Sequence, residues 1–178
     1  MPRESIKAKT DRTAAIICKL QITYPNARCE LTYSSPLELL IATILSAQCT
    51  DKQVNIVTSY LFKKYRAASD YIEVHLEELQ NDIKRIGLFR NKSKSIQKCC
   101  RSLIENHGGS VPANMKSLIA LAGVGRKTAN VVLGNAFNIN EGVVVDTHVA
   151  RLSNRLGFTL EKNPETVSYT HLTLPTKA

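Results

Sequence analysis

Apolar residues recur with a helical period along most of the chain, which predicts an all-α fold. The short β-branched run at 142–145 has no second strand to pair with, and we interpret it as an extended connection. The segment at 36–47 is apolar on nearly every side, so we expect it at the centre of the core. The periodic segments predict helices at about 11–22, 36–47, 51–65, 75–86, 91–107, 114–121, 126–137 and 147–156.

Polar residues and glycines mark where several of these helices begin and end. Ser35 is a typical N-cap, followed by Pro36 at the first helical position and by Glu38, which would close a capping box. Thr50 occupies an equivalent place before the next helix. Gly87 stops a later one, because glycine readily adopts the left-handed conformation that ends helices.

The last stretch, residues 167–178 (VSYTHLTLPTKA), does not share this pattern. It has no helical period and no charge pairing, and its composition differs from that of the preceding chain. We interpret it as a non-native tail; the alternative is a natural disordered terminus. We therefore leave it out of the fold prediction.

The amino-acid composition indicates which kind of molecule the protein could bind. The 178 residues suffice for one domain or two small ones, and 24 Lys and Arg against 15 Asp and Glu give a net charge of +9. This balance favours a polyanion such as nucleic acid or an acidic membrane surface. No apolar run reaches the roughly 20 residues of a spanning helix. The start of the chain, MPRESIKAKTDR, lacks the apolar core of a signal peptide, so we expect a cytoplasmic protein.

The cysteines point to the same compartment. An odd number of cysteines without a secretory signal indicates reduced thiols in the cytosol. No CxxC pair is present, so the sequence shows no local metal site. The five cysteines are Cys18, Cys29, Cys49, Cys99 and Cys100.

The strongest local motif is LAGVGRKTAN at 121–130, which predicts a helix-hairpin-helix. Its glycines permit a tight turn, and the second helix would present free N–H groups and its positive end to an anion. A DNA phosphate fits such a site without base reading, whereas a plain corner between two helices is the alternative. The predicted DNA contacts in the hairpin are Gly123, Val124, Gly125, Arg126 and Thr128. Cationic residues available to phosphates are Lys63, Lys64, Lys84, Arg85, Arg90, Lys92, Lys94, Arg126 and Lys127.

Lys127 and Asp146 are the candidate catalytic residues. Lys127 lies in the first turn of a helix, where a cation is unfavourable, and both the helix end and Arg126 favour its neutral, nucleophilic form. The alternative is a lysine that simply binds phosphate. Asp146 precedes a helix, so it could be an ordinary N-cap. If the chain returns to Lys127, the same carboxylate could activate the amine or stabilise positive charge on a sugar ring.

Four segments together resemble the bacterial endonuclease III family, which comprises DNA glycosylases with AP lyase activity in the helix-hairpin-helix superfamily. The resemblance covers about residues 11–166 and implies that Lys127 is a Schiff-base nucleophile and Asp146 the catalytic carboxylate. The segments are LSAQCTD (45–51), IGLFRNKSKSI (86–96), LAGVGRKTANVVL (121–133) and VVDTHVARLSNRLG (144–157).

The same resemblance assigns three further residues to DNA. Gln48 would fill the gap left by a flipped base, Leu88 would wedge into the duplex, and His148 would lie near the extruded base. Each has a simpler interpretation. Gln48 could form hydrogen bonds at a helix end, Leu88 could be a core residue after a glycine stop, and His148 could be an ordinary residue of a helical first turn. We expect a monomer that acts on duplex DNA with damaged pyrimidines or abasic sites. The alternatives are a monofunctional or mismatch-specific glycosylase, and an inactive DNA-binding fragment.

The sequence also departs from the family. Ala122 stands where the family usually has proline, which should relax the hairpin slightly. The four-cysteine loop that binds a [4Fe-4S] cluster in the family has no counterpart among the cysteines here, so we expect no cofactor in this chain. The resemblance predicts a helical domain at 28–139 that contains the hairpin at 114–137. It also predicts an incomplete second domain, formed by residues 1–27 and 140–166.

Overall fold

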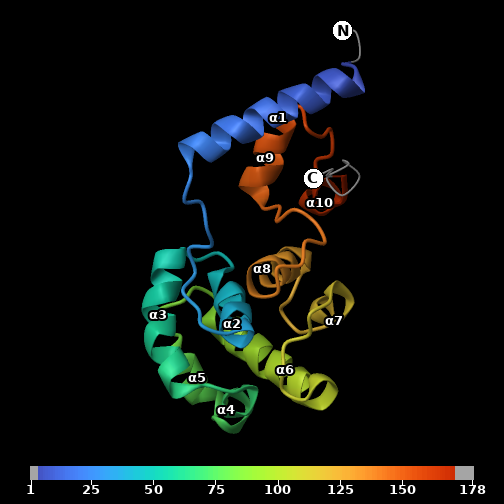
Figure 1. The fold of residues 1–178 in the computed structure, drawn as a ribbon. Helices are drawn as coiled ribbons and strands as arrows, with labels where there is room; N and C mark the ends of the chain where they lie inside the picture. Colours follow the sequence, from blue (N-terminus) through green and yellow to red (C-terminus); the bar gives the residue numbers. More distant parts are fainter. Residues whose placement is uncertain (1–3, 171–178) are drawn as a thin grey trace.

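The computed structural model describes residues 4–170, which fold into helices joined by loops (Figure 1). No strand forms among these residues, so the all-α prediction is confirmed. The helices are α1 (Ile6–Thr23), α2 (Pro36–Ser46), α3 (Asp51–Lys64), α4 (Ala68–Glu73), α5 (Leu76–Asp82), α6 (Phe89–His107), α7 (Met115–Ile119), α8 (Arg126–Ala136), α9 (Thr147–Arg155) and α10 (Pro164–Thr170).

The start of α2 shows how local polar groups fix a helix end. The Ser35 hydroxyl accepts a hydrogen bond from the Glu38 N–H at 3.2 Å, as predicted for an N-cap. The Glu38 carboxylate, however, accepts from the N–H and the hydroxyl of Ser34 at 2.6 and 2.7 Å. The predicted capping box is therefore displaced by one residue, and the carboxylate fixes the chain just before the helix.

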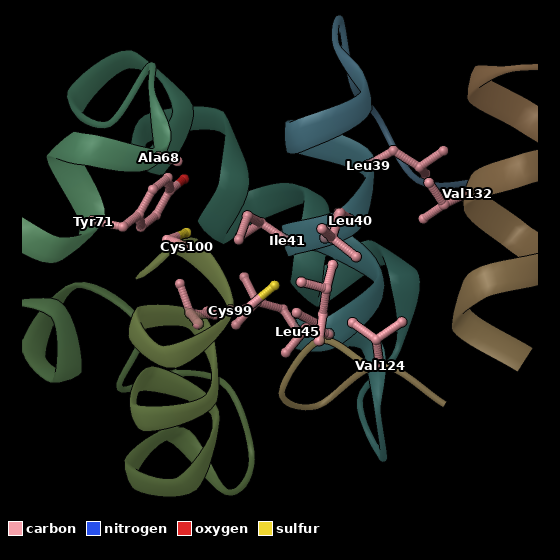
Figure 2. Close-up of a cluster of buried hydrophobic side chains, with 14 of the residues drawn as sticks. Leu39, Leu40, Ile41, Leu45, Ala68, Tyr71, Cys99, Cys100, Val124 and Val132 are labelled. Atoms are coloured by element: carbon pink, nitrogen blue, oxygen red, sulfur yellow. The ribbon is translucent and has the colours of Figure 1, made fainter. Parts of the chain in front are cut away.

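Helix α2 is the centre of the larger hydrophobic core, as its sequence predicted. It packs against α3, α6 and α8, and Leu39, Leu40, Ile41 and Leu45 are completely buried. Figure 2 shows Leu39 beside Val132 of α8. This core also contains residues of α6 and of the hairpin. Helix α2 therefore helps to position the segments of residues 36–136 that the sequence suggested as DNA contacts.

A second and much smaller cluster joins α9, α10 and the extended residues before α9. Val145, Ala150 and Val167 are buried there. Helix α1 passes over α9 at one end of the molecule (Figure 1) but buries no residue of its own. It is held by polar contacts, including the Lys9 ammonium, which donates to the Phe158 carbonyl at 3.0 Å.

Two short helices were not predicted. Helix α4 has only six residues, too few for a clear period. Helix α10 extends into the segment interpreted as a tail: Val167 is buried in the small cluster and Ser168 is also buried. Residues 171–178 lie outside the described part, so the non-native origin of the tail stays a prediction from sequence. None of the helices among residues 4–170 is long and apolar enough to cross a membrane.

Candidate functional site

The turn between α7 and α8 is fixed by its first glycine. Gly123 has a φ of +78°, in the region that favours glycine, and a Cβ built on it would lie 3.0 Å from the Cβ of Ser95 on α6. Both the backbone conformation and the close approach of Ser95 therefore disfavour a side chain at this position. Leu121 and Val124 are buried on either side and hold the turn against the core.

The surroundings of the second glycine, Gly125, differ from those of Gly123. Gly125 has an ordinary φ of −91°, and a Cβ built on it would meet nothing within 4 Å. No side chain caps the start of α8. The backbone at Gly125 thus borders open space, which leaves room for an external anion to approach the start of α8.

The other predicted hairpin contacts differ in exposure. Val124 faces inward: its side chain is 6% exposed, and its N–H donates to the Leu121 carbonyl at 3.2 Å. Its side chain therefore belongs to the core, and the contact of Val124 with DNA stays a prediction. Thr128 is half-buried, and the half-buried Arg126 donates to the Glu141 carbonyl at 3.4 Å.

The structure brings Lys127 and Asp146 together. The Nζ atom of Lys127 lies 3.8 Å from Oδ2 of Asp146, and the two side chains are 53% and 37% exposed. The other oxygen of Asp146, Oδ1, accepts hydrogen bonds from the N–H groups of His148 and Val149, both at 2.9 Å. The N-cap interpretation and the paired interpretation of Asp146 are thus compatible, because each uses a different oxygen.

These contacts favour the charged form of Asp146. The N–H of Val149 is the largest influence that lowers the carboxyl pKa below its ordinary value, with further lowering by the Lys127 charge and the His148 N–H. Partial burial opposes this shift without reversing it. The carboxylate is therefore ionised at neutral pH and available to a cation or a developing positive charge.

Residues 142–145 carry Asp146 back to α8. The chain there is extended without pairing as a strand, in agreement with the sequence prediction. The Val143 carbonyl accepts from Asn130 of α8 at 3.4 Å and from the Ser168 hydroxyl at 2.9 Å. A pocket of about 490 Å³ adjoins this junction, and Lys127 and Asn130 are among the residues that line it.

Gln48 and Leu88 occupy neighbouring exposed turns. Both have left-handed backbones, with φ of 53° and 59°, and a Cβ built on Gly87 would lie 3.6 Å from the Gln48 carbonyl. Leu88 is 55% exposed, so it is not the core residue of the simpler interpretation. His148 is exposed in the first turn of α9. The contacts of all three with DNA stay predictions.

Lys92 is a correction to the predicted set of phosphate-binding cations. Its side chain is buried, and its ammonium donates to the carbonyls of Leu45 and Ala47. Burial lowers its pKa. The helical period could have predicted this burial, because Lys92 falls on the same buried face of α6 as Ile96 and Cys99. Lys64 is also engaged, in ion pairs with Glu78 and Asp82 at 2.8 and 2.7 Å.

The cysteines of residues 4–170 do not gather into one cluster. Cys99 and Cys100 are buried in the larger core, and desolvation raises the pKa of Cys99 to about 12. Cys18 is exposed on α1, far along the chain from both. Across residues 4–170, no three side chains of His, Cys, Asp or Glu gather in a way that could hold a metal ion.

Known proteins match this chain in sequence and in structure. Endonuclease III of Bacillus subtilis is 55% identical over 139 residues, which is 78% of this chain and 63% of the relative. Endonuclease III of Synechocystis is 50% identical over 157 residues, 88% of this chain and 72% of the relative. The chain thus spans less than two thirds of the Bacillus protein.

Solved structures agree with these matches. One determined as a non-covalent endonuclease III–DNA complex is 48% identical, with a TM-score of 0.85 over 92% of this chain and 78% of the other. A thermostable thymine-DNA glycosylase shares the fold, at 23% identity and a TM-score of 0.82 over 94% of this chain and 81% of the other. The family model for HhH-GPD superfamily base excision DNA repair proteins matches residues 41–175. The chain belongs to this HhH-GPD superfamily, with endonuclease III homologues as its relatives.

Proposed function

We propose that the chain acts on duplex DNA as a bifunctional glycosylase and AP lyase of the endonuclease III type. The single observation that carries this proposal is the 3.8 Å approach of Lys127 to Asp146 at the start of α8. An amine beside a carboxylate has a means of losing its proton, and Lys127 is exposed enough to meet a large substrate. A module that only bound DNA would have no use for this pairing.

Binding would begin at the hairpin. The open space at Gly125 and the uncapped start of α8 can accept a phosphate, and the net charge of +9 attracts the polyanion. Gln48 and Leu88 project from separate turns and would enter the duplex where a damaged pyrimidine leaves the stack. Expulsion of the base would bring the sugar C1′ within reach of Lys127.

The chemistry would follow from the two side chains. The proton of Lys127 passes to Asp146, and the amine nitrogen forms a bond to C1′ while the bond from C1′ to the base breaks. The base leaves with the electron pair of that bond and takes the proton from Asp146, which returns to its ionised form. The nitrogen then passes a proton, through Asp146, to the ring oxygen O4′ as the C1′–O4′ bond breaks, which gives a protonated imine. The C2′ proton passes to water, and the electron pair it leaves behind expels the 3′ phosphate as the C3′–O bond breaks. The ionised Asp146 stabilises the positive charge of the imine.

Borohydride trapping tests the proposal, because reduction of the imine joins the protein covalently to DNA. We expect trapping on a duplex with an abasic site, and its loss in Lys127→Gln with nearly unchanged DNA affinity. Lys116→Gln is the matched control, since Lys116 is an exposed cation of the adjacent α7. Trapping that persists in Lys127→Gln would identify another amine as the nucleophile. Binding without any trapping by the unaltered chain would favour a non-catalytic module.

A further inference from the structure

A buried lysine connects the two exposed turns that carry Gln48 and Leu88. Lys92 of α6 is only 5% exposed, and its ammonium donates to the Leu45 carbonyl at 2.9 Å and to the Ala47 carbonyl at 2.6 Å. These carbonyls lie at the end of α2, where backbone acceptors have no helical partner. The positive charge also suits the negative end of that helix. The side chain therefore fixes the backbone immediately before Gln48.

The backbone of the same residue fixes the other turn. The Lys92 N–H donates to the Leu88 carbonyl at 3.0 Å, and the Asn91 N–H donates to that carbonyl at the same distance. Lys92 thus contacts one turn through its main chain and the other through its side chain. The two turns also approach each other directly, since a Cβ on Gly87 would lie 3.6 Å from the Gln48 carbonyl.

Both turns hold a residue in the left-handed region of backbone conformation. Only three non-glycine residues among those described have a positive φ: Gln48, Leu88 and Asn138. A leucine rarely adopts this conformation, and Leu88 holds it while its side chain is 55% exposed. Strained residues with exposed side chains occur most often at functional sites, where the surrounding structure maintains the strain.

We propose that Lys92 is a positioning residue that sets Gln48 and Leu88 relative to each other before DNA arrives. The inference rests on the proposed function, because it requires that both side chains enter a duplex. With both turns fixed by one buried ammonium, the two side chains act as a preformed pair, and binding costs less ordering of loops. Lys92 does this without a phosphate contact, since its charge is enclosed by the protein.

The test compares affinities for an abasic-analogue duplex and for an undamaged duplex of the same sequence, measured by fluorescence anisotropy. We expect Lys92→Met to reduce the preference for the abasic duplex by about tenfold, a typical coupling between residues in one network. The matched control is Lys98→Met, which removes an equal charge from the exposed face of the same helix and should keep the preference. A lysine that bound phosphate would instead weaken both affinities equally.

A second background separates positioning from simple stability. We expect the Gln48→Ala/Leu88→Ala double variant to lose the preference, so Lys92→Met should change it no further in that background. A further decrease in that background would overturn the inference. Fluorescence of 2-aminopurine opposite the abasic analogue, measured at saturating protein, should fall in Lys92→Met to the value of the double variant.

Other outcomes are also decisive. If the unaltered chain shows no preference for the abasic duplex, the proposed function fails. If it shows the preference and a folded Lys92→Met retains it, only the role of Lys92 fails. Circular dichroism shows whether each variant is folded. If Lys92→Met does not fold, Lys92→Gln takes its place, because glutamine keeps an amide donor. If neither the Lys92→Met nor the Lys92→Gln variant folds, Lys92 is needed for folding itself, and the inference is overturned.

Discussion

Asp146 divides its two carboxylate oxygens between the backbone of its own helix and the ammonium of Lys127. Oδ1 caps α9 through two hydrogen bonds of 2.9 Å, and Oδ2 lies 3.8 Å from Lys127 Nζ. The cap thereby fixes the direction in which the second oxygen points. An aspartate that caps α9 thus also presents a carboxylate oxygen to Lys127 of α8.

Asparagine at this position separates the two roles. Asp146→Asn retains an acceptor for the cap, so we expect the melting temperature to change little. It removes the charge beside Lys127, so the single-turnover rate of imine formation should fall by about 10²–10⁴-fold. Asp146→Ala, which also loses the cap, should cost about 1 kcal/mol of stability in addition. Equal rates for Asp146→Asn and the unaltered chain would exclude a catalytic carboxylate here.

The two hairpin glycines should respond differently to alanine. Gly123→Ala forces a left-handed alanine against Ser95, and we expect a loss of about 1–3 kcal/mol in the free energy of unfolding. Gly125→Ala meets open space in the free protein, so its stability should be nearly unchanged while its affinity for duplex DNA falls. Urea unfolding and anisotropy titration measure the two effects. Unimpaired DNA binding by Gly125→Ala would argue against close approach of a phosphate.

Binding should weaken steeply with salt. If about five cations engage phosphates, the logarithm of the association constant falls with the logarithm of salt at a slope near −4.5. Lys94→Met removes an exposed cation of α6 and should make the slope shallower by about 0.9. Lys64 is already paired with Glu78 and Asp82, so Lys64→Met should change the slope little. A flat salt response of the folded protein would contradict phosphate binding altogether.

Acid should destabilise the protein through carboxylates that accept backbone N–H groups. Asp70 accepts from the N–H groups of Ala67 and Arg66, which lower its pKa, and the pKa of Asp146 is lowered as well. A carboxyl whose folded pKa lies below its unfolded value stabilises the fold above the unfolded value, about 3.9. This stabilisation disappears as the pH falls through the folded pKa. The melting temperature should therefore drop below about pH 4, and less so in Asp70→Asn.

Helix α9 should exchange amide hydrogens faster than α2. Helix α2 is enclosed by the larger core, whereas Leu152 of α9 is exposed and the cluster beneath it is small. Exchange measured by mass spectrometry at pH 7 compares the peptides that cover the two helices. Equal protection of both would show that the smaller cluster is as stable as the larger one.

Much of the helical framework could be predicted from sequence, because amphipathic periods and caps such as Ser35 are local signals. Helix α10 could not, since its stability depends on burial of Val167 against residues from elsewhere in the chain. The left-handed conformation of Leu88 also opposes local propensity.

Within the candidate site, a helix followed by an extended return suggested that Asp146 could reach Lys127, and the two side chains do meet. The hairpin motif put Val124 among the predicted DNA contacts, and its charge put Lys92 among the cations available to phosphates. Both residues are buried, because Val124 anchors a turn and Lys92 finds two carbonyl partners inside the protein. Burial of a lysine depends on acceptors far away in sequence, and these are visible only in the folded chain.

The proposed catalytic pair draws its two members from unequal clusters: Lys127 lies in the first turn of α8, which packs in the larger one, and Asp146 follows Val145 of the smaller one. The observed rate constant is therefore an intrinsic rate multiplied by the fraction of molecules in which the small cluster is closed. Warming should open that cluster first. Activity would then decline reversibly at temperatures where the signal from the larger core is still native, and the temperature optimum would report local rather than global stability.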